Sequence, residues 1–579
     1  MSLVSKKDII SAIQLDKLGL EFTADLLMQA SGINKLNDLY DRLAGKHGLE
    51  FLDAAFDDLK VKYETDAEEM KNIPAKGAFI VVSNHPFGML DGMLLIRIIC
   101  EKRPDFKMMA NFLLQKIEPI AQYFIYVDPF EGDDVKSKSI RGIKDAMMHL
   151  SNGNGLGIFP AGEVSTYQSG FRNIKDKEWH GTIVKLLKKV AVPVVPVYFH
   201  GTNRLIFHLL GKIHPSLRTA TIPAELFHKK DAIQIRIGTP ITIDEQKKFK
   251  THEELGKYLR AMVYALGAPL SQRKSFQQRL QSLRRPKKIV EPGDSVLVQK
   301  EMDYLRRGKP LVARNDYEVF LAPANEIPDT LREIGRLREL TYRKVGEGTN
   351  QSIDLDEFDR YYQHLFLFDR SEKKIVGAYR FGQGDEIFER FGKKGFYTST
   401  LFNYDEKILH YLKNTLELGR SFVVEEYQRK AFPLFLLWKG IEKYLSENRQ
   451  YRYLLGPVSI SSSYSELTRS LIIQFIKRHY YDPELAKSVH ARQEFEVMED
   501  DELGILLDNY PDDMNELDKL ISEIEPSHFK VPVLLKKYIR QNARIIGFNI
   551  DPKFNSALDG LMILDLKNLP EDTLYKEIG

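Results

Sequence analysis

The chain has 579 residues, which is too long for one ordinary hydrophobic core and predicts two domains of conventional size. Its net charge is +3, with a basic first half and an acidic second half. The single cysteine, Cys100, excludes an internal disulfide framework and a multi-cysteine metal site, and it is typical of a reducing compartment. The basic half suits an anionic membrane surface or an acidic protein, and because no nucleic-acid motif accompanies this charge, we expect no nucleic-acid partner.

The sequence predicts at most peripheral contact with a membrane. Residues 1–20 lack the apolar core and the cleavage site of a secretory signal. The longest apolar run is interrupted by His85, Asp91 and Arg97, so it does not reach the roughly 18 uncharged residues of a membrane span. We therefore expect a cytoplasmic protein that is at most peripheral on the membrane.

The spacing of apolar residues along the chain changes near residue 71. Residues 5–70 have apolar positions three and four apart, which predicts an N-terminal helical segment over residues 1–70. Runs rich in β-branched residues then alternate with helix-length segments; the runs cover residues 78–84, 122–130, 155–163, 190–201 and 231–241. This alternation predicts an α/β domain over residues 71–268, built around a buried and largely parallel sheet.

A basic segment follows this domain. Seven Lys and Arg side chains lie between Arg273 and Lys288, no acidic residue occurs before Glu291, and prolines mark its end. We interpret residues 269–310 as a basic linker. The segment is either a solvated connection or an interfacial helix that holds the protein on anionic lipid.

The remaining residues, 311–579, predict a second α/β or α+β domain. Strands are expected at 317–323, 373–382, 415–423 and 451–461, and a helix at 430–448. The acidic stretch Glu494–Glu525 interrupts the domain, and we interpret it as a solvated helical insertion.

A histidine and an aspartate flank a glycine-containing turn after the first predicted strand. Transfer of an acyl group to a hydroxyl requires a base, and neutral imidazole is the usual one near physiological pH. Asp91 can orient the ring of His85 if a helix begins near Gly88. The alternative stays open that His85 caps this helix and that Asp91 is an ordinary acid of its first turn.

Four segments in chain order resemble the glycerolipid O-acyltransferase family, which is built around an Asn-His-(X)4-Asp motif. They are NHPFGMLD, KMMANFLLQKIEPIAQYFIYVDP, GIFPAGEVS and VPVVPVYFHGTN. The resemblance implies that His85 is the base, that Asp91 orients it, and that no metal is needed. It also implies substrate-binding positions at Asn84, Gly88, Phe159, Pro160, Gly162 and Glu163.

Two departures from the family pattern shape the expected substrate. Five residues separate His85 from Asp91 where the family has four, so Gly88 must loosen the turn for the pair to meet. The third segment lacks the arginine that the family uses on the acceptor's phosphate, which predicts an acceptor without glycerol phosphate. "NHPFG" with "FPAGE" instead resembles the hemolysin-like branch that is found in aminolipid synthesis.

Three further features of this domain have open or secondary roles. Glu163 either orients the acceptor's polar head or caps the following segment. Arg141 either occupies the family's arginine position or is a solvated helix residue. A helix N-terminus near Gly88 would offer backbone N–H groups to a developing oxyanion.

The second half resembles an acetyltransferase-like (GNAT) N-acyltransferase of the ornithine-lipid type, related in fold to acyl-homoserine-lactone synthases. The resemblance rests on LELGRSFVVEEYQ, on FLLWKGIEKYL with YRYLLGPVSIS, and on residues 531–570. It implies that Glu417 accepts an amine proton, directly or through water, and that Arg420 binds a carboxylate or a donor group. The alternative is a structural ion pair at a strand end.

The phosphate-binding loop expected in this fold is altered. Counting from Gln428, its first candidate position, alanine stands at 431 and proline at 433, and proline lacks the N–H that a phosphate would accept from. An acyl carrier protein, held also through its own surface, is therefore a better acyl donor than coenzyme A.

The whole chain resembles fused bifunctional ornithine/glycine lipid synthases of bacteria. The resemblance implies that the C-terminal domain joins a 3-hydroxyacyl group to the amine of ornithine or glycine, and that the N-terminal domain then acylates the 3-hydroxyl of this lyso-aminolipid. No bound cofactor is expected, and the enzyme would work peripherally on the inner face of the cytoplasmic membrane. The alternatives are a lysophospholipid acyltransferase with a regulatory GNAT-like domain and a hemolysin-like membrane-active protein.

Overall fold

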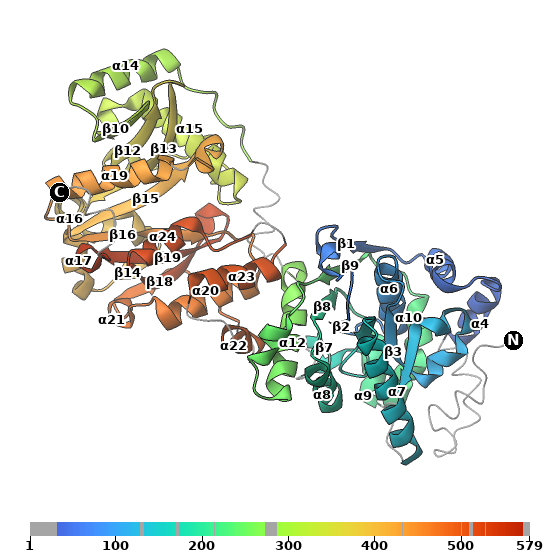
Figure 1. Cartoon of the computed structure of the whole chain (residues 1–579). Helices are drawn as coiled ribbons and strands as arrows, with labels where there is room; N and C mark the ends of the chain where they lie inside the picture. The colour runs from blue at the N-terminus through green and yellow to red at the C-terminus, as the bar shows by residue number, and fades with distance from the viewer. Residues whose placement is uncertain are drawn as a thin grey trace. The chain divides into compact units, whose positions relative to one another are not determined.

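The structure is a computed structural model, and it describes residues 32–127, 133–168, 173–213, 215–271, 286–430, 432–498, 501–508, 513–526 and 529–570. The chain folds into two compact units (Figure 1). The first unit comprises Met1–Ser271 and Asp500–Asn509, and the second comprises Gln272–Glu499 and Tyr510–Gly579. Each unit contains its own central sheet.

The first unit has a seven-stranded sheet with the order β1-β9-β8-β2-β5-β3-β4. Neighbouring strands are parallel except β8 and β9, so the predicted α/β layer with a largely parallel sheet is observed. The strands are β1 (Tyr63–Thr65), β2 (Phe79–Ser83), β3 (Lys107–Asn111), β4 (Phe124–Val127), β5 (Gly155–Ile158), β8 (Val194–Phe199) and β9 (Ile233–Ile237). A separate hairpin joins β6 (Thr166–Gln168) and β7 (Asn173–Lys175).

Helices cover this sheet. A continuous apolar core joins strand residues such as Phe79 and Val81 to α5 and α6, while α12 packs on β8 and β2 and against α8. Burial from both faces accounts for the strongly apolar strand sequences. The helices of the unit are α4 (Ile33–Arg42), α5 (Gly48–Leu59), α6 (Met89–Cys100), α7 (Asp133–Ser151), α8 (Gly181–Val190), α9 (Leu205–Ile213), α10 (Pro215–Leu226), α11 (Ile243–Lys247), α12 (His252–Gly267) and α22 (Asp501–Asp508).

The second unit has an eight-stranded sheet with the order β10-β11-β12-β13-β15-β16-β19-β18. All neighbours are antiparallel except β15 and β16. The strands are β10 (Val312–Arg314), β11 (Tyr317–Pro323), β12 (Gln363–Asp369), β13 (Lys374–Gln383), β15 (Thr415–Val423), β16 (Tyr453–Ile460), β18 (Arg544–Asp551) and β19 (Ala557–Asp565). A small sheet pairs β14 (Phe402–Tyr404) with β17 (Val489–Ala491).

Two helical layers cover opposite faces of this second sheet (Figure 1). Helix α19 (Phe432–Glu447) packs against Leu365, whereas α14 (Ser295–Arg307) and α15 (Pro328–Lys344) share a core with its neighbour Phe366. Successive side chains of a strand point to opposite faces, so these helices lie on different sides. The other helices are α16 (Gly384–Phe391), α17 (Leu409–Lys413), α18 (Glu425–Gln428), α20 (Glu466–His479), α21 (Pro483–Ala486), α23 (Met514–Ile524) and α24 (Val533–Arg540).

Strands β15 and β16 stay paired only at their beginnings. Thr415–Glu417 pair with Tyr453–Leu455, and no further pairs follow although both strands continue. Beyond Glu417, β15 has a bulge: Gly419 and Phe422 pair with residues on β13 that are only two apart, and Arg420 in the bulge has a φ of 51°. A bulge re-aims side chains and ends regular pairing, so this part of the sheet opens between two central strands.

Two predictions about connecting segments were wrong in part. Residues 295–307 of the predicted linker form helix α14, whose Val298 and Met302 are buried in the core of the second unit. Residues 272–285, which carry much of the basic segment, lie outside the described residues. The acidic insertion is not simply solvated either, because its helices bury apolar side chains, Leu503 and Leu506 from α22 and Leu517 and Leu520 from α23. Among the described residues, no helix has the length and apolar character to cross a membrane.

Candidate active sites

His85 and Asp91 lie together at the end of strand β2. The chain leaves β2 at Ser83, turns at Gly88 with a φ of 76°, and enters helix α6. This left-handed conformation suits glycine and accommodates the five-residue spacing. The structure therefore brings the predicted pair together, with Nδ1 of His85 3.0 Å from Oδ2 of Asp91.

Asp91 is held in place by the turn itself. Its Oδ2 accepts hydrogen bonds from the backbone N–H groups of Phe87 (2.9 Å) and Gly88 (3.1 Å), and the side chain is 0% exposed. Burial raises the pKa of this carboxyl, while the bond to His85 and the two backbone donors lower it. A fixed acid beside Nδ1 favours the tautomer that carries its proton there and leaves Nε2 as the acceptor.

The ring of His85 is positioned from two other sides. It stacks on Phe159 with ring centroids 3.8 Å apart, and its backbone binds both Asp176 Oδ1 and the N–H of Ser165. The side chain is 16% exposed, and Nε2 makes no hydrogen bond to the described residues. This nitrogen is therefore available to take a proton from a hydroxyl.

Asp176 is a supporting residue that sequence reasoning missed. Its carboxylate accepts a 2.5 Å hydrogen bond from Ser165 Oγ, and its backbone carbonyl accepts one from Arg260 of α12 (2.9 Å). Arg260 in turn pairs with Glu502 of α22, which also binds Lys175 at 2.8 Å. No motif marks Asp176, because its partners come from segments far apart in the sequence.

Three of the other predicted residues of the first unit have identifiable structural contacts. Asn84 joins β2 to β8 by bonding both the N–H and the carbonyl of Phe199. Gly162 has a φ of 69°, and the carbonyl of Pro160 accepts from the N–H of His180 at 3.0 Å. These contacts shape the segment that carries Phe159 under the imidazole.

The two charged candidates of this unit lie elsewhere. Glu163 forms a 2.7 Å ion pair with Lys177. Arg141 is exposed on α7, and no contact between described residues links it to His85. The structure thus does not bring Glu163 or Arg141 onto the imidazole.

Glu417 is enclosed by hydrogen-bond donors. One oxygen accepts from the backbone N–H and hydroxyl of Thr398, and the other accepts from the N–H of Tyr397 and from the hydroxyl of Tyr362. The residue is 1% exposed. Because both oxygens are occupied by the protein, the geometry favours a role in holding the 3-10 segment Tyr397–Thr400 over abstraction of a substrate proton.

Arg420 does not pair with Glu417. Its guanidinium contacts Asp356 at 3.1 Å and the hydroxyl of Tyr397 at 3.2 Å, and its Nε lies 3.6 Å from Asp354. It belongs to a network in which Arg338 and Arg380 also bind acidic residues, namely Asp354, Asp356 and Asp359. The predicted cleft-facing pair of Glu417 and Arg420 is therefore replaced by two separate groups.

Gln428 is exposed at the end of α18 and donates its side-chain N–H to the carbonyl of Val423 at 2.9 Å. Helix α19 begins at Phe432, so Pro433 occupies its first turn. Residue 431 lies outside the described residues. One of the N–H groups that a helix N-terminus offers to an anion is thus missing here.

A second group of acids, which sequence reasoning missed, lies near Arg420. Asp551 accepts from the hydroxyl of Tyr397 (3.2 Å), and Asp559 accepts from Ser459 Oγ (2.6 Å). Burial, with the nearby charge of Asp551, raises the pKa of Asp559 to about 8, and burial raises the pKa of Glu347 to about 7. These residues come from separate elements, so no local sequence pattern indicates them.

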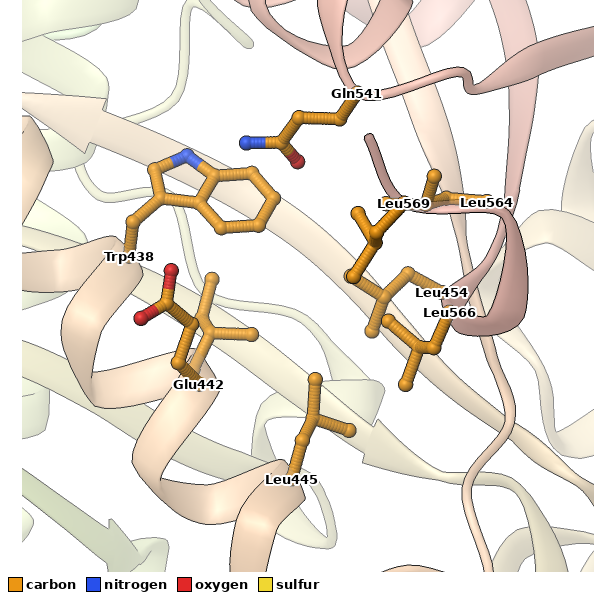
Figure 2. Close-up of a pocket in the computed structure, with 9 residues that line it drawn as sticks. Trp438, Glu442, Leu445, Leu454, Gln541, Leu564, Leu566 and Leu569 are labelled. Atoms are coloured by element: carbon orange, nitrogen blue, oxygen red, sulfur yellow. The ribbon is translucent and has the colours of Figure 1, made fainter. Parts of the chain in front are cut away.

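A small apolar pocket lies on the opposite face of the same sheet. Figure 2 shows the indole of Trp438 and the amide of Gln541 above a group of leucines, and Glu442 of α19 also lines this space. Leu454 and Leu564 form part of its wall. Leu454 points away from the face that carries its neighbour Leu455, so this pocket is separate from the Asp559 group.

Comparison with known proteins identifies both units. A family described as "Acyltransferase" matches residues 22–272, and one described as "Acetyltransferase (GNAT) domain" matches residues 337–438. The chain joins an acyltransferase domain to a GNAT domain. It is an acyltransferase enzyme, and the two predicted folds are confirmed.

Individual relatives each match part of the chain. The glycine N(alpha)-acyltransferase of Bacteroides thetaiotaomicron is 29% identical over 307 residues, which is 50% of this chain and 89% of that protein. The lyso-glycine lipid O-acyltransferase of Phocaeicola vulgatus is 29% identical over 241 residues, or 40% of this chain and 83% of that protein. Each of these relatives matches half of this chain or less and is covered over most of its own length.

Proposed function

We propose that the chain makes a phosphate-free aminolipid by two successive acylations. The GNAT domain joins a 3-hydroxyacyl group to the amine of an amino acid, and the acyltransferase domain then esterifies the new hydroxyl. The names of the relatives support this pairing, and they favour glycine over ornithine as the head group. The observation that carries the proposal is the 3.0 Å contact of His85 with Asp91 on a chain that also carries a GNAT domain.

The O-acylation follows from the atoms around His85. Nε2 takes the proton of the lyso-lipid hydroxyl while the oxygen attacks the thioester carbonyl. Asp91 holds Nδ1 and balances the imidazolium that forms. The tetrahedral intermediate then expels the thiolate, which receives the proton from Nε2.

The acyl donor is proposed to be an acyl carrier protein thioester. Pro433 weakens a phosphate site at the start of α19, while Arg429 and Lys430 are exposed just before it and suit an acidic protein surface. The open edges of β15 and β16 beyond Glu417 and Leu455 offer backbone groups to an extended thioester arm.

The membrane contact is proposed to be peripheral. Leu205, Ile206 and Leu209 of α9 are 58%, 57% and 39% exposed, which is unusual for large apolar side chains on one short helix. They follow Asn203, the last residue of the fourth family segment, and α9 packs on β6 of the same domain. Such a surface suits an enzyme whose lyso-lipid substrate lies in the bilayer.

The test uses the full chain with an acyl carrier thioester of a 3-hydroxy fatty acid, and glycine or ornithine as acceptor. We expect mass spectrometry to detect the N-acyl amino acid and then its O-acylated form. His85→Ala should stop at the first product, while His149→Ala should make both, because this half-buried residue of α7 bonds the carbonyl of Gly155 and does not contact His85. The proposal would be contradicted if the His85 variant formed diacylated lipid at the normal rate, or if the enzyme preferred a phosphate-containing acceptor to the lyso-aminolipid.

A further inference from the structure

Two groups of mostly buried charged side chains meet around Arg420 in the GNAT domain. In the first, Arg338, Arg380 and Arg420 are matched by acidic side chains at ion-pair distance, Asp354, Asp356 and Asp359. In the second, Glu347, Asp551 and Asp559 form no ion pair with any basic side chain among the described residues. A buried carboxylate is normally paired or neutralised, so the second group would hold its negative charge most readily beside a cation.

The second group converges where the sheet opens. Ser459 lies on the part of β16 beyond its last pair with β15, and it donates to Asp559 on the neighbouring strand β19. On the other side of the opening, Arg420 reaches Tyr397, whose hydroxyl donates to Asp551 of β18. These contacts link the acids on β19 and β18 to Ser459 and Arg420, which lie on the two strands that border the gap proposed for the thioester arm.

The opening also has an unsatisfied donor. Nε of Arg420 is buried and makes no hydrogen bond among the described residues, because Oδ2 of Asp354 is 3.6 Å away; the side chain is only 9% exposed. Arg420 stacks over the rings of Tyr397 and Phe554, 4.7 Å and 4.1 Å from their centroids. A polar group that binds here would satisfy this donor, and a ligand with both positive and negative ends fits a site bordered by acids and one arginine.

The rim of this region is polar and reachable. Asp551 and Asp559 are only 2% and 3% exposed, but Glu347 and Ser459 are partly exposed. Gly346, next to Glu347, accepts a hydrogen bond from Asn555, which ties the loop after α15 to the loop between β18 and β19. Glu347 and Ser459 are therefore the members of this region that solvent can reach.

We infer that Asp559 is the base of the N-acylation and that, with Asp551 and Glu347, it binds the ammonium group of the acceptor amino acid. This assignment rests on the proposed function and replaces Glu417 in the role predicted from sequence. Glu417 is ruled out as the base by its four protein donors, whereas Asp559 accepts one hydrogen bond from a side chain, that of Ser459.

The step balances with the groups present. The carboxylate of Asp559 takes one proton from the ammonium, and the freed lone pair attacks the carbonyl carbon of the thioester. The C–N bond forms, the C–S bond breaks, and a second proton leaves nitrogen for the departing sulfur. The products are an amide and a thiol, and Asp559 returns its proton to solvent.

The pH dependence follows from the groups that face Asp559. Burial and the charges of Asp551 and Glu347 raise its pKa to about 8, while Ser459 and Arg420 lower it. A base must be unprotonated, so N-acylation should rise with pH to a plateau above about 8. Removal of the Ser459 hydroxyl should move this midpoint to higher pH.

The test compares Asp559→Asn with Asp565→Asn, a matched change on the same strand whose carboxylate pairs with Arg452 at 2.6 Å. We expect Asp559→Asn to lower kcat for N-acylation by about 10²-fold or more and to lose the midpoint near pH 8, with O-acylation of added lyso-lipid unchanged. Ser459→Ala should move the midpoint to higher pH, and Asp565→Asn should match the wild type. An Asp559 variant with a wild-type rate and pH profile overturns the assignment.

A binding measurement separates this assignment from the proposed function. Titration calorimetry with glycine at pH 9, where Asp559 is ionised, should show binding to the wild type and to the Asp565 variant but not to the Asp559 variant. If the wild type forms no amide yet shows this binding pattern, the proposed function fails and the amine site stands. If all three proteins bind glycine equally, the amine site fails whatever the products are.

Discussion

The substitution Asp91→Asn gives the sharpest test of the acyltransferase site. Oδ2 of Asp91 accepts from two backbone N–H groups and faces Nδ1 of His85. The introduced amide can satisfy those backbone donors only with its oxygen, so its NH2 group turns toward the imidazole. Nδ1 must then act as acceptor, and the ring proton moves to Nε2, where it blocks removal of the proton from the hydroxyl.

The expected loss can be estimated from this tautomer change. An inverted imidazole with intact geometry costs on the order of 10⁴-fold in kcat, or about 5 kcal/mol of transition-state stabilisation. Stability should be retained, because burial raises the pKa of Asp91 and the folded protein therefore loses stability from this group as pH rises. The neutral asparagine side chain avoids this loss of stability at pH values above the usual pKa of a carboxyl group.

The assay is O-acylation of synthetic lyso-lipid by the purified chain, with N-acylation measured on the same protein as a control for folding. The matched control is Asp53→Asn. Asp53 lies on α5, and its exposed ion pair is with Arg97, which lies on α6 as Asp91 does; the loss of this pair should leave both rates unchanged. O-acylation by the Asp91 variant at more than about a tenth of the wild-type rate would refute the role of Asp91 in fixing the tautomer.

Three further outcomes follow from the geometry. Glu417→Gln should lower the thermal midpoint of the GNAT domain. The amide has only one acceptor oxygen, so a buried donor that now binds Glu417 loses its acceptor, which costs about 1–3 kcal/mol. An unchanged calorimetric transition would contradict this. Gly88→Ala should cost about 1–3 kcal/mol and lower O-acylation, since a φ of 76° with a ψ of −130° disfavours a side chain; normal rates would show that the turn tolerates one. Asp559→Asn should flatten the fall in stability that the wild type shows as pH rises from about 4 to about 8, which denaturant titrations at several pH values can check.

The sequence was most informative where structure is local. The predicted strands at 317–323 and 415–423 coincide with β11 and β15, because runs of β-branched and aromatic residues buried in a sheet have few alternatives. The contact of His85 with Asp91 could be predicted because both residues flank one turn and only the conformation of Gly88 had to be inferred. Strand β3, with two methionines in its centre, carries no such signal.

The GNAT site could not be predicted in the same way. The sequence placed Glu417 correctly within a strand, but whether that face is open to substrate depends on the segment Tyr397–Thr400, which supplies most of its donors. Asp559 and Ser459 are a hundred residues apart and meet only because β16 pairs with β19. Such a group is identified by acidic side chains that lack a basic partner. This can be judged only once the structure shows the partners of every arginine.

The path of the chain also constrains how the two activities can be separated. Helix α22 follows most of the GNAT domain in sequence but belongs to the first unit, where it packs on α12 and buries Leu503 and Leu506. Its Glu502 pairs with Arg260, which binds the backbone of Asp176 behind His85. A fragment that ends at residue 271 would expose this apolar surface and remove the partner of Arg260. The site around His85 is therefore completed by residues encoded after the GNAT domain begins, and point variants of the full chain can separate the two proposed reactions where truncation would damage both.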